Sequence, residues 1–148
     1  MSEHKVSLRW KLETQDFRYP TYNRDHTWTF DGGVQVQASA APAYLGNSQL
    51  VDPEEAFMAS ISSCHMLTFL AIACKKRLRV EAYADDAVGF MEKNEVGRLA
   101  ITRAELHPVI TFGGDVRPTK EQIHEMHELA HGECFIANSV KTIVTVVQ

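Results

Sequence analysis

The sequence predicts an α+β protein in which two helices of unequal length pack against mainly antiparallel sheets. Three observations carry this prediction: alternating strand patterns, a long apolar helix that starts at Asp52, and a shorter capped helix that starts at Thr119. The order is strands, helix, strands, helix, strand, which is typical of folds whose helices are segregated from antiparallel sheets. The chain has no internal repeat and no linker, so we expect residues 1–148 to form a single domain.

The first third of the chain predicts one strand, a loop and a hairpin. Apolar and polar residues alternate over residues 5–13, which is typical of a half-buried strand. Residues 15–25 are polar and irregular, and we expect a loop there. Alternation resumes over residues 27–30, and an Asp-Gly-Gly turn at residues 31–33 precedes a second alternating run at residues 34–38. This pattern predicts a β-hairpin.

A long helix is predicted from Asp52 to about Lys76. Asp52 can cap the helix, Pro53 suits its first position, and Glu55 completes a pattern like a capping box. The interior is rich in Ala, Ser and Leu and contains no Gly. A helix of this length and apolar character should be central and largely buried.

The second half of the chain predicts three more strands and a shorter helix. The strands are expected at residues 80–89, 97–112 and 143–147. Thr119, with a Gln three residues later, caps a second helix that should run to about His131. The glycine that follows at position 132 is expected to end this helix.

Composition excludes some classes of function. Fifteen basic residues against nineteen acidic ones give a net charge of -4, which argues against a nucleic-acid surface. We expect no membrane helix, because no stretch approaches the ~20 apolar residues that one needs. The N-terminus carries no apolar signal region, so the protein is expected to be cytoplasmic, with neither nucleic acid nor a membrane as partner.

Three cysteines are the most informative residues of the chain. Their odd number argues against a disulfide-stapled secreted fold. Cys64 lies in the long predicted helix and Cys134 just beyond the second helix, so the two can be a reactive pair or small packing residues. Cys74 lies roughly 15 Å from Cys64 along the same helix, which is too far for a disulfide. We therefore expect Cys74 to be a packing residue.

A second motif lies in the shorter helix. Residues 127–131, His-Glu-Leu-Ala-His, match the HExxH pattern of zinc proteases. A catalytic zinc needs a third protein ligand, and no histidine follows His131. Cys134 or His124 would have to complete a structural site. We expect a chance match, and we keep a zinc-binding or hydrolase domain built on His127, His131 and Cys134 as an alternative.

Several segments together resemble the OsmC/Ohr family of osmotically inducible and organic hydroperoxide resistance proteins. The resemblance extends over nearly the whole chain, and a second cysteine seventy residues after Cys64 is part of it. The other segments that carry it are residues 24–33 (Arg-Asp-His-Thr-Trp-Thr-Phe-Asp-Gly-Gly), 39–42 (Ser-Ala-Ala-Pro) and 52–65 (Asp-Pro-Glu-Glu-Ala-Phe through Ser-Cys-His).

The resemblance implies an obligate, intertwined homodimer with an OsmC-like fold and a thiol peroxidase site. Cys64 matches the peroxide-reacting cysteine and Cys134 the resolving cysteine. Glu54 matches the carboxylate that steers an active-site arginine, for which Arg24 is our candidate and Arg18 the alternative. In the best-known branches a proline follows the second cysteine, whereas a phenylalanine follows it here, which indicates a less characterised branch.

The same resemblance defines the expected chemistry. An organic hydroperoxide is the implied substrate, and an external dithiol, for which a lipoyl-type group is one candidate, resets the cysteine pair. No metal or organic cofactor is required. A third hypothesis, beside the peroxidase and the zinc domain, is a non-catalytic dimer that binds a small lipophilic ligand.

Overall fold

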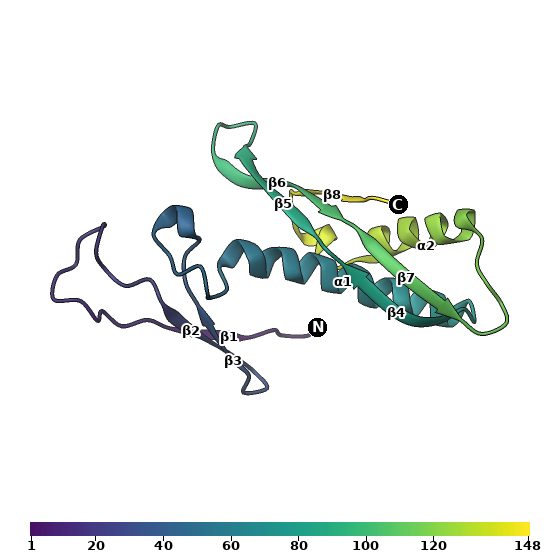
Figure 1. The fold of residues 1–148 in the computed structure, drawn as a ribbon, viewed down its shortest axis with the longest axis horizontal. Helices are drawn as coiled ribbons and strands as arrows, with labels where there is room; N and C mark the ends of the chain where they lie inside the picture. The colour runs from purple at the N-terminus through teal and green to yellow at the C-terminus, as the bar shows by residue number, and fades with distance from the viewer. The chain divides into compact units, whose positions relative to one another are not determined.

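The computed structural model describes residues Met1–Gln148 and confirms the α+β class (Figure 1). The chain divides into two compact units, Met1–Ala56 and Phe57–Gln148. Its elements are β1 (Val6–Arg9), β2 (His26–Phe30), β3 (Gln35–Ala38), η1 (Pro42–Tyr44), α1 (Pro53–Lys75), β4 (Arg79–Asp85), β5 (Val88–Lys93), β6 (Leu99–Leu106), β7 (Pro108–Gly113), α2 (Lys120–Glu133), η2 (Ala137–Ser139) and β8 (Ile143–Val146).

The first unit contains a three-stranded antiparallel sheet in the order β1-β2-β3. The predicted hairpin joins β2 to β3, and Gly33 turns the chain with φ +86°, a conformation that favours glycine. β1 is shorter than predicted and ends at Arg9. The reason is that the following residues bond to the loop instead: the Trp10 indole donates to the Asn23 carbonyl at 2.8 Å, and the Asn23 amide donates to the Lys11 carbonyl at 2.8 Å.

Helix α1 begins and ends at well-formed caps. The Glu55 N–H donates to the Asp52 carboxylate at 2.8 Å, and the Asp52 N–H donates to the Glu55 carboxylate at 3.2 Å, so the predicted capping box is present. At the other end, Arg77 has φ +59° and Leu78 N–H donates to the Ala73 carbonyl at 3.0 Å. This is the Schellman pattern, and it stops the helix without a glycine.

The second unit holds two small sheets. β4 pairs with β7 antiparallel, and the other sheet has the order β5-β6-β8, with β6 and β8 parallel. The two long strands predicted at residues 80–89 and 97–112 are therefore each divided in two. The division occurs where the chain changes sheets, and there the Asp85 carboxylate accepts the His107 N–H at 2.6 Å.

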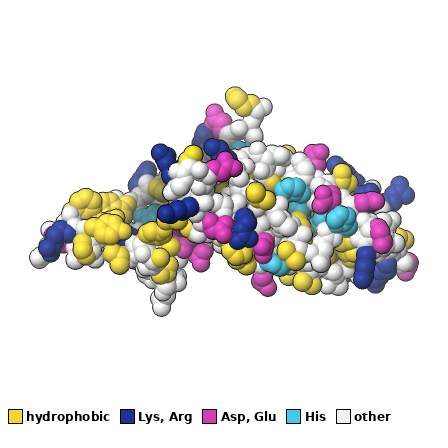
Figure 2. Space-filling view, turned by 90° about the horizontal axis from the view of Figure 1, so that it is seen from above, with side chains coloured by type: hydrophobic (Ala, Val, Ile, Leu, Met, Phe, Trp, Pro, Cys, Tyr) yellow, Lys and Arg dark blue, Asp and Glu magenta, His cyan; other side chains and the backbone are white.

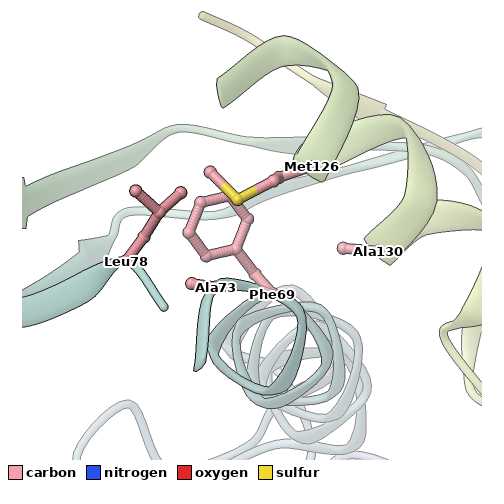
Figure 3. Packing of buried hydrophobic residues seen from close by; sticks show 5 residues of the cluster. All are labelled: Phe69, Ala73, Leu78, Met126 and Ala130. Carbon is pink, nitrogen blue, oxygen red and sulfur yellow. The ribbon is translucent and has the colours of Figure 1, made fainter. Parts of the chain in front are cut away.

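Two apolar clusters form the core of the second unit. In Figure 3 the Phe69 ring of α1 points towards Met126 of α2, with Leu78 and the two alanines around it. This first cluster comprises Phe69, Ala73, Leu78, Met126 and Ala130. The second comprises Ile61, Ala104, Leu106 and Val144, which join α1 to the sheet of β5, β6 and β8.

Within one chain, α1 is buried along a single stripe. Its buried residues are Ile61, His65, Phe69 and Ala73, spaced by four, and Leu67 on another side is 60% exposed. By length and composition α1 could cross a membrane, so the expectation that no stretch qualifies was wrong. Its stripe contributes to both apolar clusters, and α1 is thus the core helix of this unit.

Helix α2 is capped as predicted but is longer than predicted. Thr119 and Gln122 form the expected capping box. The helix continues through Gly132 to Glu133, so the expectation that Gly132 ends it was wrong. Gly132 lies in the last turn of the helix, and its carbonyl accepts a hydrogen bond from the Asn138 side chain at 2.9 Å. Cys134 is the C-terminal cap, and its N–H bonds the His131 carbonyl.

Candidate active site

The structure brings Cys64 and Cys134 together in the second unit. Cys64 lies half-buried in the middle of α1, Cys134 is buried at the end of α2, and all three cysteines are free thiols. Burial raises the pKa of Cys134, and the neighbouring Cys64 thiol raises it further. The Ala137 N–H acts against this rise by donating to the Cys134 sulfur at 3.4 Å. Cys74 is exposed and lies outside this pair.

A firmly bonded turn holds Cys134 in place. The Asn138 N–H donates to the Cys134 carbonyl at 3.0 Å, and the Asn138 side chain donates to the Gly132 carbonyl at 2.9 Å. The Ser139 hydroxyl donates to the Phe135 carbonyl at 2.7 Å. The residues after Cys134 thus wrap back on the end of α2, and the thiol is presented from an ordered cap.

His65, the residue after Cys64, turns into the core and pairs with His127 of α2. The two rings are nearly parallel and meet edge to edge, with centroids 5.3 Å apart and planes 9° apart, and Nε2 of His65 lies 3.0 Å from Nδ1 of His127. Burial lowers the pKa of each imidazole to about 4, helped by neighbouring histidines and opposed by Asp85. At neutral pH the pair is therefore uncharged, and His65 supplies no imidazolium to Cys64.

The sequence patterns did not single out this pair, although a spacing was present that could have found it. His65 lies four residues after Ile61 and four before Phe69, within the buried stripe of α1. His127 lies beside Met126 on the buried side of α2. Polar residues at core positions of two helices are candidates for partners of one another, because a buried imidazole needs a hydrogen bond.

The HExxH segment is arranged differently from a zinc site. His127 faces His65, and His131 Nδ1 is buried without a hydrogen-bond partner. No group of three or more His, Cys, Asp or Glu side chains is arranged to hold a metal ion.

Arg24 lies in the first unit, in a cluster of aromatic rings. Its guanidinium donates to the carbonyls of Tyr22 at 2.6 Å and Tyr19 at 2.5 Å, and stacks on the Tyr22 ring at 3.9 Å. It has no carboxylate partner, whereas Arg18 pairs with Asp16 at 2.5 Å.

An open cavity of about 380 Å³ adjoins Arg24. Its lining residues are Trp10, Phe17, Tyr22, Arg24, His26, Ser39, Ala40 and Pro53. Exposed hydrophobic side chains gather on the first unit, on the left of Figure 2. The first unit thus offers an unpaired cation beside an apolar surface.

Glu54 is the remaining predicted site residue. Its Oε2 atom is buried and has no hydrogen-bond partner. Glu54 and Arg24 both belong to the first unit, and they form no ion pair with each other. Their roles, like those of the two cysteines, stay predictions.

The fold and the thiol pair define a class of protein: an α+β chain that presents a half-buried thiol from a long central helix to a second thiol at a helix end. Comparison with known families gives this class a name. The family model described as OsmC-like protein matches residues 46–147, and the chain belongs to that family. Arg24 precedes the matched range. Among curated proteins, none matches the sequence.

Solved structures support the assignment. An OsmC-like protein of unknown function from Vibrio cholerae is 48% identical, with 99% of each chain covered and a TM-score of 0.96. An organic hydroperoxide resistance protein from Elizabethkingia anophelis shares the fold at 18% identity, with coverage of 99% of this chain and 93% of that one, and a TM-score of 0.74. One from Bacillus subtilis does so at 19% identity, with coverage of 98% and 95%, and a TM-score of 0.67.

Proposed function

We propose that the protein is a thiol-dependent peroxidase that reduces organic hydroperoxides. The observation that carries the proposal is the approach of Cys64 and Cys134, which lie seventy residues apart in sequence and on different helices. The family includes organic hydroperoxide resistance proteins, which agrees with this chemistry. A two-thiol site can be oxidised, form a disulfide and be reset by an external dithiol.

The first step is oxidation of Cys64. The Cys64 thiolate attacks the terminal oxygen of the hydroperoxide, the O–O bond breaks, and the alkoxide leaves and takes up a proton to become the alcohol. The thiolate has become a sulfenic acid, oxidised by two electrons. Cys64 is suited to this step because it is the more exposed of the two paired thiols.

The second step joins the two cysteines. Cys134 loses its proton and its sulfur displaces hydroxide from the Cys64 sulfenic acid, so a disulfide forms and one water is released. Burial keeps Cys134 in the thiol form until then, because its pKa is raised. An external dithiol then reduces the disulfide by exchange and becomes a disulfide itself.

Arg24 and Glu54 complete the proposal. A guanidinium stabilises both a thiolate and the developing alkoxide. Arg24 is favoured over Arg18 because Asp16 already binds Arg18, whereas Arg24 bonds only two carbonyls. The Glu54 Oε2 atom is buried without a hydrogen-bond partner, and we propose that Glu54 orients Arg24 once the site is assembled. We further propose that the site forms in a homodimer, and that the protein acts in the cytoplasm, where dithiol reductants keep the pair reduced.

The experiment is mass spectrometry of the protein before and after one equivalent of an organic hydroperoxide. We expect a disulfide between Cys64 and Cys134, with Cys74 free. Cys134→Ser should consume that one equivalent and stop at the Cys64 sulfenic acid, which a further equivalent of peroxide should oxidise to the sulfinic acid. Cys74→Ser should behave as the wild type. A dominant disulfide that includes Cys74, or an unchanged mass, would refute the peroxidase.

A non-catalytic dimer that binds a small lipophilic ligand is the second candidate. The cavity beside Arg24 favours it, because apolar walls and one unpaired cation suit an apolar acid. Steady consumption of peroxide with a dithiol donor separates the two functions, since a binding protein would show none.

A further inference from the structure

The strongest unexplained feature of the second unit is the buried pair of histidines beside the two thiols. His65 is 1% exposed and His127 is 2% exposed, and the chemistry proposed above uses neither. Nε2 of His65 and Nδ1 of His127 are 3.0 Å apart, which is a hydrogen bond between α1 and α2. Apolar residues lie beside this bond and include Phe69, whose ring centroid lies 4.5 Å from that of His127.

The position of this bond matters because each histidine shares a rigid helix with one thiol. His65 is the residue that follows Cys64 in α1. His127 lies about two turns before Cys134 in α2, and a helix transmits a shift of one turn to the next almost undiminished. A directional bond between the two helices therefore fixes how α2, with Cys134 at its end, is set against the part of α1 that carries Cys64.

The bond is directional in a way that apolar packing is not. One imidazole must donate its N–H while the other accepts, so the two tautomers are matched. Loss of either partner leaves a buried ring nitrogen unsatisfied, which is costly in a core. Apolar contacts between the helices, such as those of Met126, tolerate small sliding movements far better.

We propose that His65 and His127 are a positioning pair that holds the Cys64 and Cys134 sulfurs in register for disulfide formation. The proposed peroxidase function gives this pair its biological role, and the inference rests on it in that respect alone. The geometry of the two thiols can be tested without peroxide. The groups that face the pair are His131 and His124 from α2 and Asp85 from β4. The pair is neutral at working pH and acts through geometry.

The experiment measures the equilibrium between the dithiol and the disulfide in glutathione redox buffers at neutral pH. The fraction of Cys64–Cys134 disulfide is read by mass spectrometry after thiols are trapped, in a Cys74→Ser background. His127→Leu keeps the volume of the site but removes the bond, and should lower the equilibrium constant for the disulfide by about tenfold. His127→Asn places an amide nitrogen at the Nδ1 position and should stay close to the wild type.

Two further variants make the result specific. Met126→Leu changes a fully buried neighbour on the same turn of α2 without touching the bond, and should leave the equilibrium constant unchanged. If His127→Leu fails to fold, His127→Gln replaces it in the experiment. The glutamine amide lies at the former Nε2 position and does not reach His65, so this variant should also lower the equilibrium constant for the disulfide by about tenfold.

The outcomes separate this inference from the proposed function. If the wild type forms the disulfide in glutathione but consumes no peroxide, the peroxidase proposal fails and the positioning pair stands. If His127→Leu or His127→Gln equals His127→Asn, the positioning role is refuted, whatever the peroxidase assay shows. A wild type that forms no disulfide between Cys64 and Cys134 at any glutathione ratio also refutes it.

Discussion

At the scale of single residues, Arg24, the candidate for the active-site arginine, and Arg18, the alternative, have different surroundings. Arg18 is neutralised by Asp16 and is exposed, whereas Arg24 is held by two carbonyls and a tyrosine ring. A guanidinium that already has a carboxylate must lose that partner before it can bind a developing anion. One that is oriented and unpaired needs no such exchange, which is the arrangement that stabilises charge in a transition state.

We therefore predict unequal effects of the two arginines. Arg24→Ala should lower the single-turnover rate of Cys64 oxidation by about 10²- to 10³-fold, because an oriented donor at a developing anion is worth that much. Arg18→Ala, the matched control, should change the rate little. Stopped-flow measurements with an organic hydroperoxide give both rates. Equal losses in the two variants, or a loss for Arg18→Ala alone, would contradict the assignment.

A second prediction concerns the acid side of the stability curve. His65 and His127 have folded-state pKa values of about 4, below the ordinary 6.5 of an unfolded histidine. As the pH falls from 6.5 to about 4, the unfolded chain takes up these protons and the folded chain does not, so the free energy of unfolding falls. Each such proton contributes about 1.4 kcal/mol per pH unit, and the loss ends below about pH 4.

Urea unfolding across this pH range tests the prediction. The double variant His65→Gln/His127→Asn keeps polar groups at both positions but removes both titrations. Its free energy of unfolding should fall less steeply than that of the wild type between pH 6.5 and 4. The carboxylates titrate in both proteins, so their contribution cancels when the two curves are compared. Parallel curves would mean that the histidines are not the groups that titrate.

At the scale of elements, local chemistry was predictable and sheet topology was not. Each helix start could be predicted from four consecutive residues, Asp52 to Glu55 and Thr119 to Gln122, and both capping boxes are present. The sequence predicted that residues 80–89 and 97–112 are extended strands, and most of these residues are. It could not show that the chain changes sheets at Asp86 and His107, because that depends on a contact between Asp85 and a residue far along the chain.

The same contrast applies to the site. The cysteine pair could be predicted from the sequence and the family resemblance, because the chain has only three cysteines and few residue types can act as a redox pair. The histidine pair depends on which faces of two distant helices meet. The predicted end of α2 was wrong by two residues, and the Gly132 carbonyl is bonded by Asn138, which lies beyond the helix.

The cap of α1 provides the third prediction. Asp52→Ala removes the side-chain acceptor for the Glu55 N–H and should destabilise the protein by about 1 kcal/mol. Asp52→Asn keeps an acceptor and should cost much less. Chemical unfolding of the two variants gives the difference. A loss of the same size in both would show that the charge of Asp52, and not its hydrogen bond, stabilises the helix start.

At the scale of the whole molecule, one chain covers too little of its central helix. α1 buries one stripe of residues and leaves apolar side chains such as Leu67 exposed. Large apolar surfaces of this kind are typical of subunits that associate permanently. The second copy of the chain is the occupant we propose for this surface, in line with the dimer that the family resemblance implied.

The fourth prediction follows from this uncovered helix. Light scattering over a dilution series should give the mass of a dimer, and thermal stability should fall with dilution because folding and association are linked. Leu67→Glu should shift the mass towards the monomer, while Val96→Glu, at another exposed apolar residue in the β5–β6 turn, should not. A folded wild-type monomer at micromolar concentration would contradict the prediction.

The hydrogen bond between His65 and His127 also constrains how this sequence can diverge. If an apolar residue replaces only one of the two histidines, the other keeps a buried ring nitrogen without a hydrogen-bond partner. A descendant that loses one histidine should therefore either gain an amide that keeps the bond at that position or exchange both histidines for apolar residues. Among relatives, an apolar residue at position 65 should occur together with an apolar residue at position 127.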